Sequence, residues 1–225
     1  MSLEVLFKDN HLLIVNKPCG LPVQSDNSGD KSLLDIAKEY IKTKYNKPGN
    51  VYLGLPHRLD RPTSGIVVLA KTSKALERLA KMFKTHEIQK IYWAVVDKMP
   101  PKHSDTLTHY IYRDTKKNKS FAYPNERKNT KLAKLNYKLI ANSDNYFLLE
   151  IELLTGRHHQ IRAQLAQIGC HIKGDLKYGS ARSNKDGGIH LHARKVEFIH
   201  PVSKEQISII APTPQDPLWN VFKKF

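Results

Sequence analysis

The sequence is poor in the residues that crosslink a chain or anchor it in a membrane. Its 225 residues include two cysteines, Cys19 and Cys170, and neither belongs to a Cys-x-x-Cys pair. A disulfide framework is therefore excluded, and small buried thiols in a reducing compartment are expected. No apolar run approaches the roughly 18–20 residues that span a bilayer, and the N-terminus lacks the order of a secretory signal. These absences predict a cytoplasmic protein that does not associate with membranes.

Several motifs of common enzyme classes are also missing. The sequence contains neither a Gly-x-Gly-x-x-Gly loop nor a Walker lysine, so no nucleotide cofactor is indicated. Ser64 lacks the Gly-x-Ser-x-Gly context of a hydrolase nucleophile. The segment from His57 to Asp60 resembles a kinase catalytic loop, but Leu59 displaces the carboxylate and the matching Asn is absent. A kinase and a hydrolase of these types are therefore excluded.

Acidic residues are scarce relative to basic ones. The 37 lysines and arginines outnumber the 21 aspartates and glutamates, which gives a formal net charge of +16 and a pI of about 9.7. Such a surface attracts polyanions and speeds their encounter, and nucleic acid is the commonest polyanion of this kind. The alternative is that the charge serves solubility alone.

The apolar patterning predicts an α+β protein. Strands outnumber helices and often follow each other directly, which favours a central, largely antiparallel mixed sheet flanked by helices and loops. One domain is expected over residues 1–225, with an exposed basic loop or ribbon at about 114–134 and a weakly extended proline-containing tail. Strands are expected at 4–8, 12–16, 66–70, 91–96, 106–113, 146–154, 189–192, 196–199 and 206–210. Helices are expected after Ser32, after Thr72 or Ser73, and over 159–168.

The segment around Asp60 is the first candidate for chemistry. Asp60 lies between Arg58 and Arg61 on a polar loop that directly precedes an apolar strand. A carboxylate flanked by guanidinium groups and anchored by a rigid strand is expected to stay ionised. The alternative is a surface ion pair without a catalytic role.

The second candidate is the start of the helix near residue 160. Arg157, two histidines and Arg162 gather there, and a helix N-terminus favours anions. The alternative is a solvated basic helix start. Tyr92, on a strand, is suited to stacking on a base, although a core role is the plainer interpretation. His190 and His192 share one strand face, but no third ligand with zinc-like spacing is present, so no metal is expected.

Taken together, these segments resemble the RluA-type family of pseudouridine synthases. The matching segments, in order along the chain, are Val15-Asn16-Lys17-Pro18-x-Gly20, His57-Arg58-Leu59-Asp60-x-x-Thr63-Ser64-Gly65, Lys90-x-Tyr92-x-Ala94-x-Val96, Thr155-Gly156-Arg157-x-His159-Gln160-Ile161-Arg162, Ile168-Gly169, Gly174-Asp175-x-x-Tyr178-Gly179, Leu191-His192-Ala193 and His200-Pro201. Pro62 replaces a more usual acidic residue, and Leu135 replaces a usual Thr.

The resemblance implies the pseudouridine-synthase fold, with a catalytic cleft across the sheet and no N-terminal S4-like domain. It implies isomerisation of uridine in rRNA or tRNA stem-loops to pseudouridine, without a cofactor. Asp60 would then be the essential carboxylate, as nucleophile or as base, and Arg162 would pair with it. Tyr92 would stack on the uracil and assist proton removal from C5.

The remaining candidates are assigned to substrate binding. Arg58 would fill the gap left by the flipped base, while Leu59 and Ile161 would wall the pocket. His57 and Arg157 are expected nearby, and Lys116, Lys117 and Lys119 are expected to contact phosphates. A monomer is expected. The alternatives are a catalytically silent RNA-binding or ribosome-assembly protein on the same fold, and a metal-dependent nuclease using His190 and His192.

Overall fold

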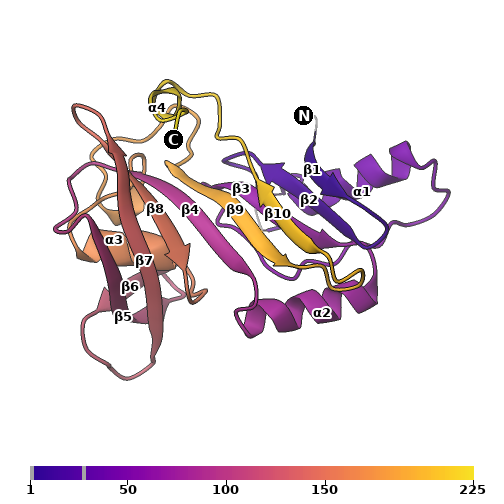
Figure 1. The fold of residues 1–225 in the computed structure, drawn as a ribbon, viewed down its shortest axis with the longest axis horizontal. Helices are drawn as coiled ribbons and strands as arrows, with labels where there is room; N and C mark the ends of the chain where they lie inside the picture. Colours follow the sequence, from indigo (N-terminus) through magenta and orange to yellow (C-terminus); the bar gives the residue numbers. More distant parts are fainter. Residues whose placement is uncertain (1–2, 27–28) are drawn as a thin grey trace. The chain divides into compact units, whose positions relative to one another are not determined.

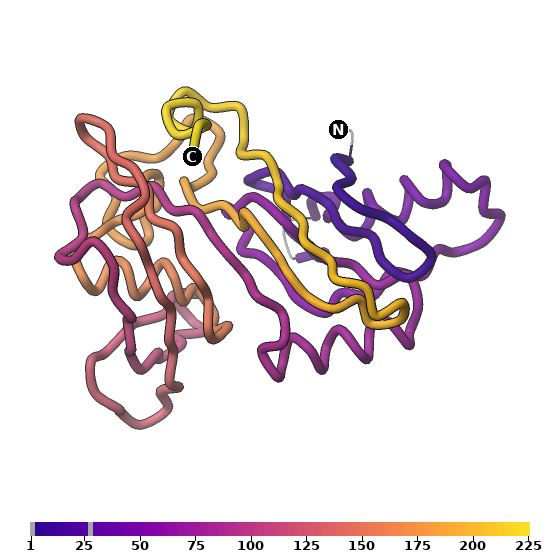
Figure 2. The backbone as a smooth tube through the Cα atoms, viewed as in Figure 1, coloured from indigo at the N-terminus to yellow at the C-terminus, as the bar shows by residue number. Residues whose placement is uncertain are grey.

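The computed structural model describes residues 3–26 and 29–225, which form two compact units. The first unit comprises Met1–Ile88 and Ala193–Pro212, and the second comprises Gln89–His192 and Thr213–Phe225. Within the described residues the chain forms ten strands and four α-helices, which confirms the α+β expectation. Figure 1 labels these elements, and Figure 2 traces the chain through them. No helix of the described residues has both the length and the apolar character needed to cross a bilayer.

The first unit is built on five strands and two helices, and its β1–β2, β2–β3 and β9–β10 pairs are antiparallel. Its strands are β1 (Glu4–Lys8), β2 (Leu12–Lys17), β3 (Ser64–Ala70), β9 (Leu191–Ile199), whose first two residues belong to the second unit, and β10 (Gln206–Ile210). Strand β3 is buried along its whole length, as its run of apolar residues predicted. Helix α1 (Leu33–Lys44) begins with a capping box between Ser32 and Asp35, and α2 (Ser73–Lys84) is capped by Thr72.

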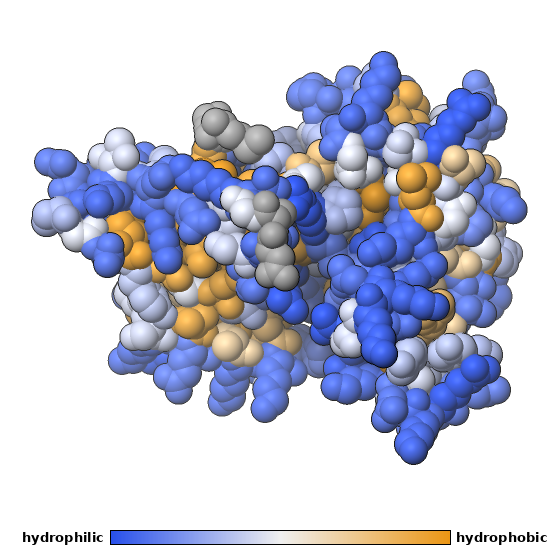
Figure 3. Space-filling view, turned by 180° about the vertical axis from the view of Figure 1, so that it is seen from behind, coloured by the Kyte–Doolittle hydropathy of each residue, from blue (hydrophilic) through white to orange (hydrophobic). Residues whose placement is uncertain are grey.

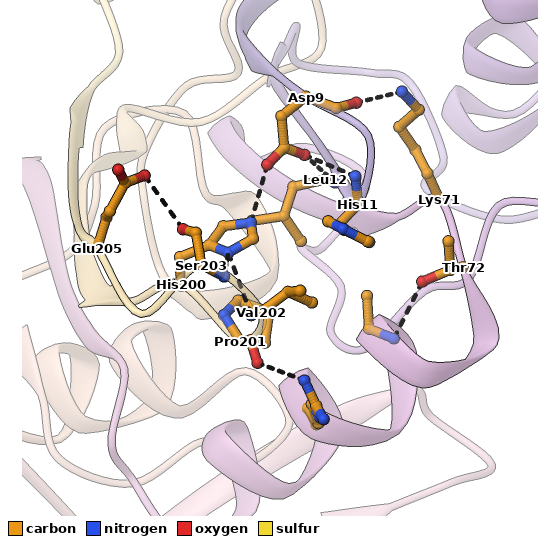
Figure 4. A network of polar contacts seen from close by, with 12 residues as sticks. Asp9, His11, Leu12, Lys71, Thr72, His200, Pro201, Val202, Ser203 and Glu205 are labelled. Atoms are coloured by element: carbon orange, nitrogen blue, oxygen red, sulfur yellow. Dashed lines mark hydrogen bonds and ion pairs between the residues drawn. The ribbon is translucent and has the colours of Figure 1, made fainter.

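A polar network joins three parts of the first unit (Figure 4). His200 Nδ1 accepts hydrogen bonds from the backbone N–H groups of Val202 and Ser203, so its other ring nitrogen carries the proton. That Nε2 lies 2.9 Å from Oδ2 of Asp9 in the β1–β2 turn. Arg78 of α2 donates to the carbonyl oxygen of Pro201 at 2.8 Å. The network therefore ties α2 and the β1–β2 turn to the β9–β10 turn.

The second unit contains five strands that neighbour one another in the order β4-β8-β7-β5-β6. Its strands are β4 (Gln89–Val96), β5 (Ser104–Asp114), β6 (Lys119–Tyr123), β7 (Thr130–Asn142) and β8 (Phe147–Leu153), and each pairs with its neighbours in antiparallel orientation. Helix α3 (Gln160–Gln167) packs on one face through Ile161 and Leu165. The short helix α4 (Pro217–Val221) packs on the other face, where Trp219 meets Trp93.

Two predictions about the chain trace were wrong. Residues 189–199 were expected to form two strands, but β9 is continuous because nothing around Arg194 breaks the strand. The tail was expected to be extended, but it contains α4, which Asp216 caps and which has Pro217 in its first turn, where a missing N–H costs little. Of the two forms expected for the basic stretch at about 114–134, the structure has the ribbon, since this stretch contains β6 and the start of β7.

Candidate active site

The loop that carries Asp60 is fastened to the chain that follows β2. The N–H of Thr63 donates to the carbonyl oxygen of Asp60 at 3.0 Å and closes a turn. The carbonyl oxygen of Arg61 accepts two further bonds, from the N–H of Gly20 at 2.9 Å and from Lys17 Nζ at 3.0 Å. Asp60 itself is half-buried within this turn. The backbone beside the carboxylate is thus held by residues 17–20.

Lys17 is a functional candidate to which the sequence analysis assigned no role. Its side chain is fully buried, and Nζ donates to the carbonyl oxygens of Pro18, Leu21 and Arg61 at 2.8–3.0 Å. Burial lowers the pKa of Lys17 from 10.5 to about 7, although the charges of Cys19 and Asp60 act in the opposite direction. Three carbonyl acceptors match the three N–H bonds of an ammonium group. In the sequence, Lys17 could have been identified because it ends an apolar strand and lies inside the matched Asn16-Lys17-Pro18 segment.

Arg61 points away from the turn and fixes a second loop. Its Nε donates to the carbonyl oxygen of Gly20 at 2.9 Å, and its guanidinium lies 2.5 Å from Asp30 and 3.8 Å from Asp26. All three groups are about half exposed, so these pairs add little stability by themselves. Their effect is to connect the Asp60 turn to the loop before α1.

The three residues before Asp60 have different environments. His57 Nε2 accepts a hydrogen bond from the backbone N–H of Val68 at 2.9 Å, and its ring stacks on Phe83 with centroids 4.3 Å apart. These contacts anchor the loop to β3 and α2. Arg58 is exposed, whereas Leu59 is buried. The substrate-binding roles expected of His57, Arg58 and Leu59 stay predictions.

In the second unit, Arg162 is held by a partner that the sequence analysis did not assign. Its Nε and Nη2 lie 2.6 Å and 2.8 Å from the two carboxylate oxygens of Asp175, and both side chains are buried. The guanidinium also lies over the ring of Tyr178, at 4.9 Å from its centroid. In the sequence, Asp175 and Tyr178 could have been identified as site residues because both lie in the matched Gly174-Asp175-x-x-Tyr178 segment. The expected pairing of Arg162 with Asp60 joins residues of different units and stays a prediction.

The residues before α3 bring two histidine rings together beside Tyr178. His159 adopts a left-handed backbone conformation with φ of 53°, which is uncommon for a residue with a side chain. Its ring stacks on His158 at 3.8 Å, and its Nδ1 lies 2.9 Å from the hydroxyl of Tyr178. Burial, followed by the charges of Arg162 and other nearby cations, lowers the pKa of His159 to about 2. His159 is therefore neutral at physiological pH and is suited to hydrogen bonding rather than to carrying charge.

Tyr92 and Ile161 belong to the same part of the second unit. Tyr92 lies on β4 opposite Ile151 and packs against the core cluster that contains Ile161. Its side chain is therefore on the α3 face of the sheet, the face from which Arg162 comes. Arg157 is exposed, and its Nε donates to the carbonyl oxygen of Leu132 at 3.0 Å. The structure thus brings Tyr92 to the face of Arg162, and it holds Arg157 beside the start of β7.

His190 serves the packing of the chain's end. Its Nδ1 lies 3.0 Å from Asn184 Nδ2, and its Nε2 lies 2.9 Å from Asp216 Oδ1, at the cap of α4. Burial lowers the pKa of His190, whereas the bond to Asp216 acts in the opposite direction. Both His190 and His192 contact the ring of Trp219. Among residues 3–26 and 29–225, no three His, Cys, Asp or Glu side chains are grouped as a metal would require.

The predicted phosphate-binding lysines lie on and beside the β5–β6 turn. Lys116 and Lys117 are exposed in the turn itself. Lys119 begins β6, and its Nζ lies 5.1 Å from the ring centroid of Tyr178. Hydrophilic side chains dominate the face of the molecule shown in Figure 3, in keeping with the charged composition.

Comparison with known proteins connects these features to one family. The sequence model of a family described as RNA pseudouridylate synthase matches residues 11–167. The chain is 34% identical over 228 aligned residues to the ribosomal large subunit pseudouridine synthase D of Zymomonas mobilis, covering 96% of this chain and 71% of that protein. It is also 34% identical to the RNA pseudouridine synthase YhcT of Bacillus subtilis, covering 96% and 70% of the two chains.

A solved structure with the same fold comes from a human protein. The structure of human RNA pseudouridylate synthase domain containing 4 superposes with a TM-score of 0.80, covering 98% of this chain and 92% of that one. The identity is 24%, so this likeness shows the fold alone. It confirms the expected pseudouridine-synthase fold.

Proposed function

The chain belongs to the RNA pseudouridylate synthase family, and we propose that its own Asp60, Tyr92 and Arg162 carry the isomerisation of uridine to pseudouridine in folded RNA. The observation that carries this assignment is the Asp60 turn, which Lys17 and Gly20 hold directly before the buried strand β3. A carboxylate that must meet one sugar atom benefits from such a rigid base. Members of the family are isomerases, and RNA is their substrate.

The reaction needs no external group or electron carrier. The bond between uracil N1 and ribose C1′ breaks, the base turns while it is held, and a bond between C5 and C1′ forms. The proton on C5 leaves, and N1 gains a proton, so product and substrate have the same composition. Asp60 acts on the sugar either as the nucleophile that holds C1′ or as a base. We propose that the chain works without metal or cofactor.

Tyr92 and Arg162 are assigned to the base and to the carboxylate respectively. Tyr92 projects from the sheet face on which α3, the helix of Arg162, packs, and this supports a role beside the reacting uracil. Arg162 would keep Asp60 ionised, and its buried attachment to Asp175 supports a fixed guanidinium. Because the target base must leave its stack to be reached, exposed Arg58 would take its place. Leu59 and Ile161 would exclude water from the loosened glycosidic bond.

We also propose how the catalytic domain is organised, which RNA it binds, and its oligomeric state and location. The family match, residues 11–167, covers parts of both compact units, which supports one catalytic domain acting as a whole. The formal charge of +16 supports binding of an rRNA or tRNA stem-loop through the chain's own surface. Arg157, His57, Lys116, Lys117 and Lys119 are proposed to contribute to that surface. We further propose a monomer that works in the cytosol.

The decisive experiment measures tritium released from C5 of uridine. RNA transcribed with [5-³H]uridine is incubated with the natural chain and with Asp60→Asn, Asp60→Ala and, as a control, Asp144→Asn, which changes an exposed carboxylate of the second unit. We expect both Asp60 variants to release no tritium and to keep their RNA affinity, and the control to release tritium normally. Full release by either Asp60 variant would overturn the assignment. Binding without release by the natural chain would favour a silent RNA-binding protein.

A further inference from the structure

Four aromatic side chains form two pairs across the β5–β6 hairpin. Tyr110 lies opposite Tyr123, and Tyr112 lies opposite Phe121. Because successive side chains of a strand point to opposite faces, the four rings, two residues apart on each strand, share one face of the sheet. We call the face that carries Tyr110, Tyr112, Phe121 and Tyr123 the aromatic face.

The aromatic face is turned away from helix α3. The residues that alternate with the rings, Ile111 on β5 and Ala122 on β6, are buried in a cluster with Ala163 of α3. The rings therefore lie on the other side of the sheet from Arg162, which α3 carries. Helix α4 covers this other side at its β4–β8 end, where Trp219 packs on Trp93 and Leu148. In Figure 1, α3 lies behind the strands β5, β6 and β7.

The aromatic face is accessible to a ligand. Tyr112 is 37% exposed, and Leu132, opposite Tyr110 on β7, is 39% exposed. The other three rings are half-buried. Large exposed apolar side chains gathered on one sheet face are uncommon on a solvated surface and mark interaction sites. A face of this kind can accept a flat partner.

Cations border the rings. The guanidinium carbon of Arg127 lies 3.9 Å from the ring centroid of Tyr123, and Lys119 Nζ lies 5.6 Å from that of Phe121. Lys134 is exposed on the same face, two residues along β7 from Leu132. Residues 110–134 hold eight basic residues and two acidic ones, Asp114 and Glu126. The border therefore suits a polyanion rather than a neutral apolar partner.

We propose that the aromatic face binds a single-stranded RNA segment next to the modified stem-loop. Unpaired bases would stack on Tyr112 and Phe121, while Lys119, Arg127 and Lys134 would contact the phosphates. Duplex RNA keeps its bases inside the helix and gains nothing from the rings. The inference rests on the proposed function, since it takes RNA as the substrate. It adds an RNA contact on the sheet face opposite α3.

A purely structural explanation predicts different behaviour. Cross-strand aromatic pairs stabilise hairpins whether or not they bind a ligand. Their removal would then lower stability and leave RNA selectivity unchanged. A stacking role predicts instead a loss confined to single-stranded RNA.

The experiment measures dissociation constants for one fluorescein-labelled RNA 9-mer of mixed sequence, alone and annealed to its complement. The double variant Tyr112→Leu with Phe121→Leu keeps apolar side chains but removes the rings. We expect its Kd for the single strand to rise about tenfold or more, and its Kd for the duplex to change less than about twofold. The variant Tyr112→Phe with Phe121→Tyr keeps both rings and should keep the affinity.

Matched controls separate stacking from charge and from folding. Lys138→Ala removes a cation from the same strand and face as Lys134, and it should leave the single-strand Kd unchanged. Urea midpoints report folding, and Tyr112→Leu alone decides the question if the double variant unfolds. An unchanged single-strand Kd, or an equal loss for strand and duplex, would overturn the proposal. So would unchanged RNA binding with loss of self-association, which would make the aromatic face an interface between copies.

The binding assay does not depend on turnover. Failure of the tritium assay would remove the proposed catalytic roles and leave the single-strand measurement intact. An unchanged single-strand Kd in the double variant would remove the aromatic face as an RNA site and leave the tritium result intact.

Discussion

Arg162 and Asp175 form a buried ion pair in which two guanidinium nitrogens meet two carboxylate oxygens. The distances are 2.6 Å and 2.8 Å, and the two side chains are 5% and 1% exposed. Such a two-point contact fixes the plane of the guanidinium as well as its position. The group proposed to neutralise the catalytic carboxylate is therefore oriented by a residue 13 positions later in the chain. Asp175 is a positioning residue in this scheme.

Replacing Asp175 by Asn should affect both stability and catalysis. The change leaves a buried guanidinium without its counter-charge, and breaking a buried pair in this way costs about 3–5 kcal/mol. We expect the urea midpoint to fall accordingly. We also expect kcat for tritium release to fall at temperatures where the variant is folded, with KM for RNA much less affected.

The matched control is Asp105→Asn, which removes a partly exposed carboxylate that pairs with the exposed Lys102 at 3.1 Å in the same unit. A solvent-accessible pair of this kind contributes under about 1 kcal/mol, so stability and kcat should hold. A folded Asp175→Asn variant with the natural kcat would contradict the positioning role.

Sequence patterns located Arg162 but not the residue that holds it. Arg162 stands out because it lies in a basic segment at a helix start. Asp175 lies in a loop, and its contact with Arg162 depends on the turn formed by η1 (Leu176–Tyr178) and on the packing of Tyr178. Side-chain contacts between a helix and a distant loop have no period in the sequence, so the pattern of residues does not reveal them.

Lys17→Met should loosen the Asp60 turn. The change keeps the length of the side chain but leaves the carbonyl oxygens of Pro18 and Leu21 without the lysine donor, while that of Arg61 keeps its bond from Gly20. Each acceptor left without a donor costs about 1–3 kcal/mol, so we expect a loss of at least about 2 kcal/mol in urea unfolding. The exposed Lys31→Met is the control and should change stability by less than about 1 kcal/mol.

The same lysine gives a pH signature. Its pKa in the folded chain is about 7, below the ordinary value of 10.5 that the unfolded chain has. Between these two values the unfolded state binds more protons, so this group makes unfolding harder as pH rises, by at most about 1.4 kcal/mol per pH unit. The stability difference between the natural chain and Lys17→Met should therefore widen from pH 7 to pH 9. A constant difference over that range would show that Lys17 keeps an ordinary pKa.

The elements that sequence patterns predicted are those with a clear period or cap. Helix α1, with Ser32 as its cap, and the buried strand β3 were both predicted from local residues. Strand β7 was missed because its lysines alternate with residues such as Ala133 and Leu135, and a basic composition hides that alternation. Helix α4 was missed because the prolines around it suggested an extended tail, although Asp216 followed by Pro217 is itself a helix-start signal.

Removing charge from the β5–β6 turn should weaken RNA binding in a salt-dependent way. Replacing Lys116, Lys117 and Lys119 by Gln removes three cations beside an otherwise unchanged hairpin. We expect the slope of log K against log salt to flatten by up to about one unit for each phosphate that the variant no longer neutralises. The control replaces Lys42 and Lys47, two exposed lysines of the first unit, and should keep the slope. A triple variant with the natural slope would remove these lysines from the RNA surface.

Gly65→Ala tests whether the Asp60 turn depends on the close packing of β3. Gly65 has φ of +110°, and a Cβ placed there would lie 2.4 Å from the carbonyl oxygen of Ala193 and 2.5 Å from its nitrogen. Both are backbone atoms of β9, so no side chain can move aside. We expect a loss of about 2–4 kcal/mol in urea unfolding.

Activity should fall together with stability in this variant. Gly65 pairs with Lys17 in the β2–β3 register, so displacing it moves the lysine that holds the carbonyl oxygen of Arg61. The matched control is Gly49→Ala, where a Cβ meets no atom within 4 Å and stability should change by less than about 1 kcal/mol. Tritium release is then measured for both variants well below their melting temperatures. Natural activity in a folded Gly65→Ala variant would show that the position of Asp60 does not depend on this contact between β3 and β9.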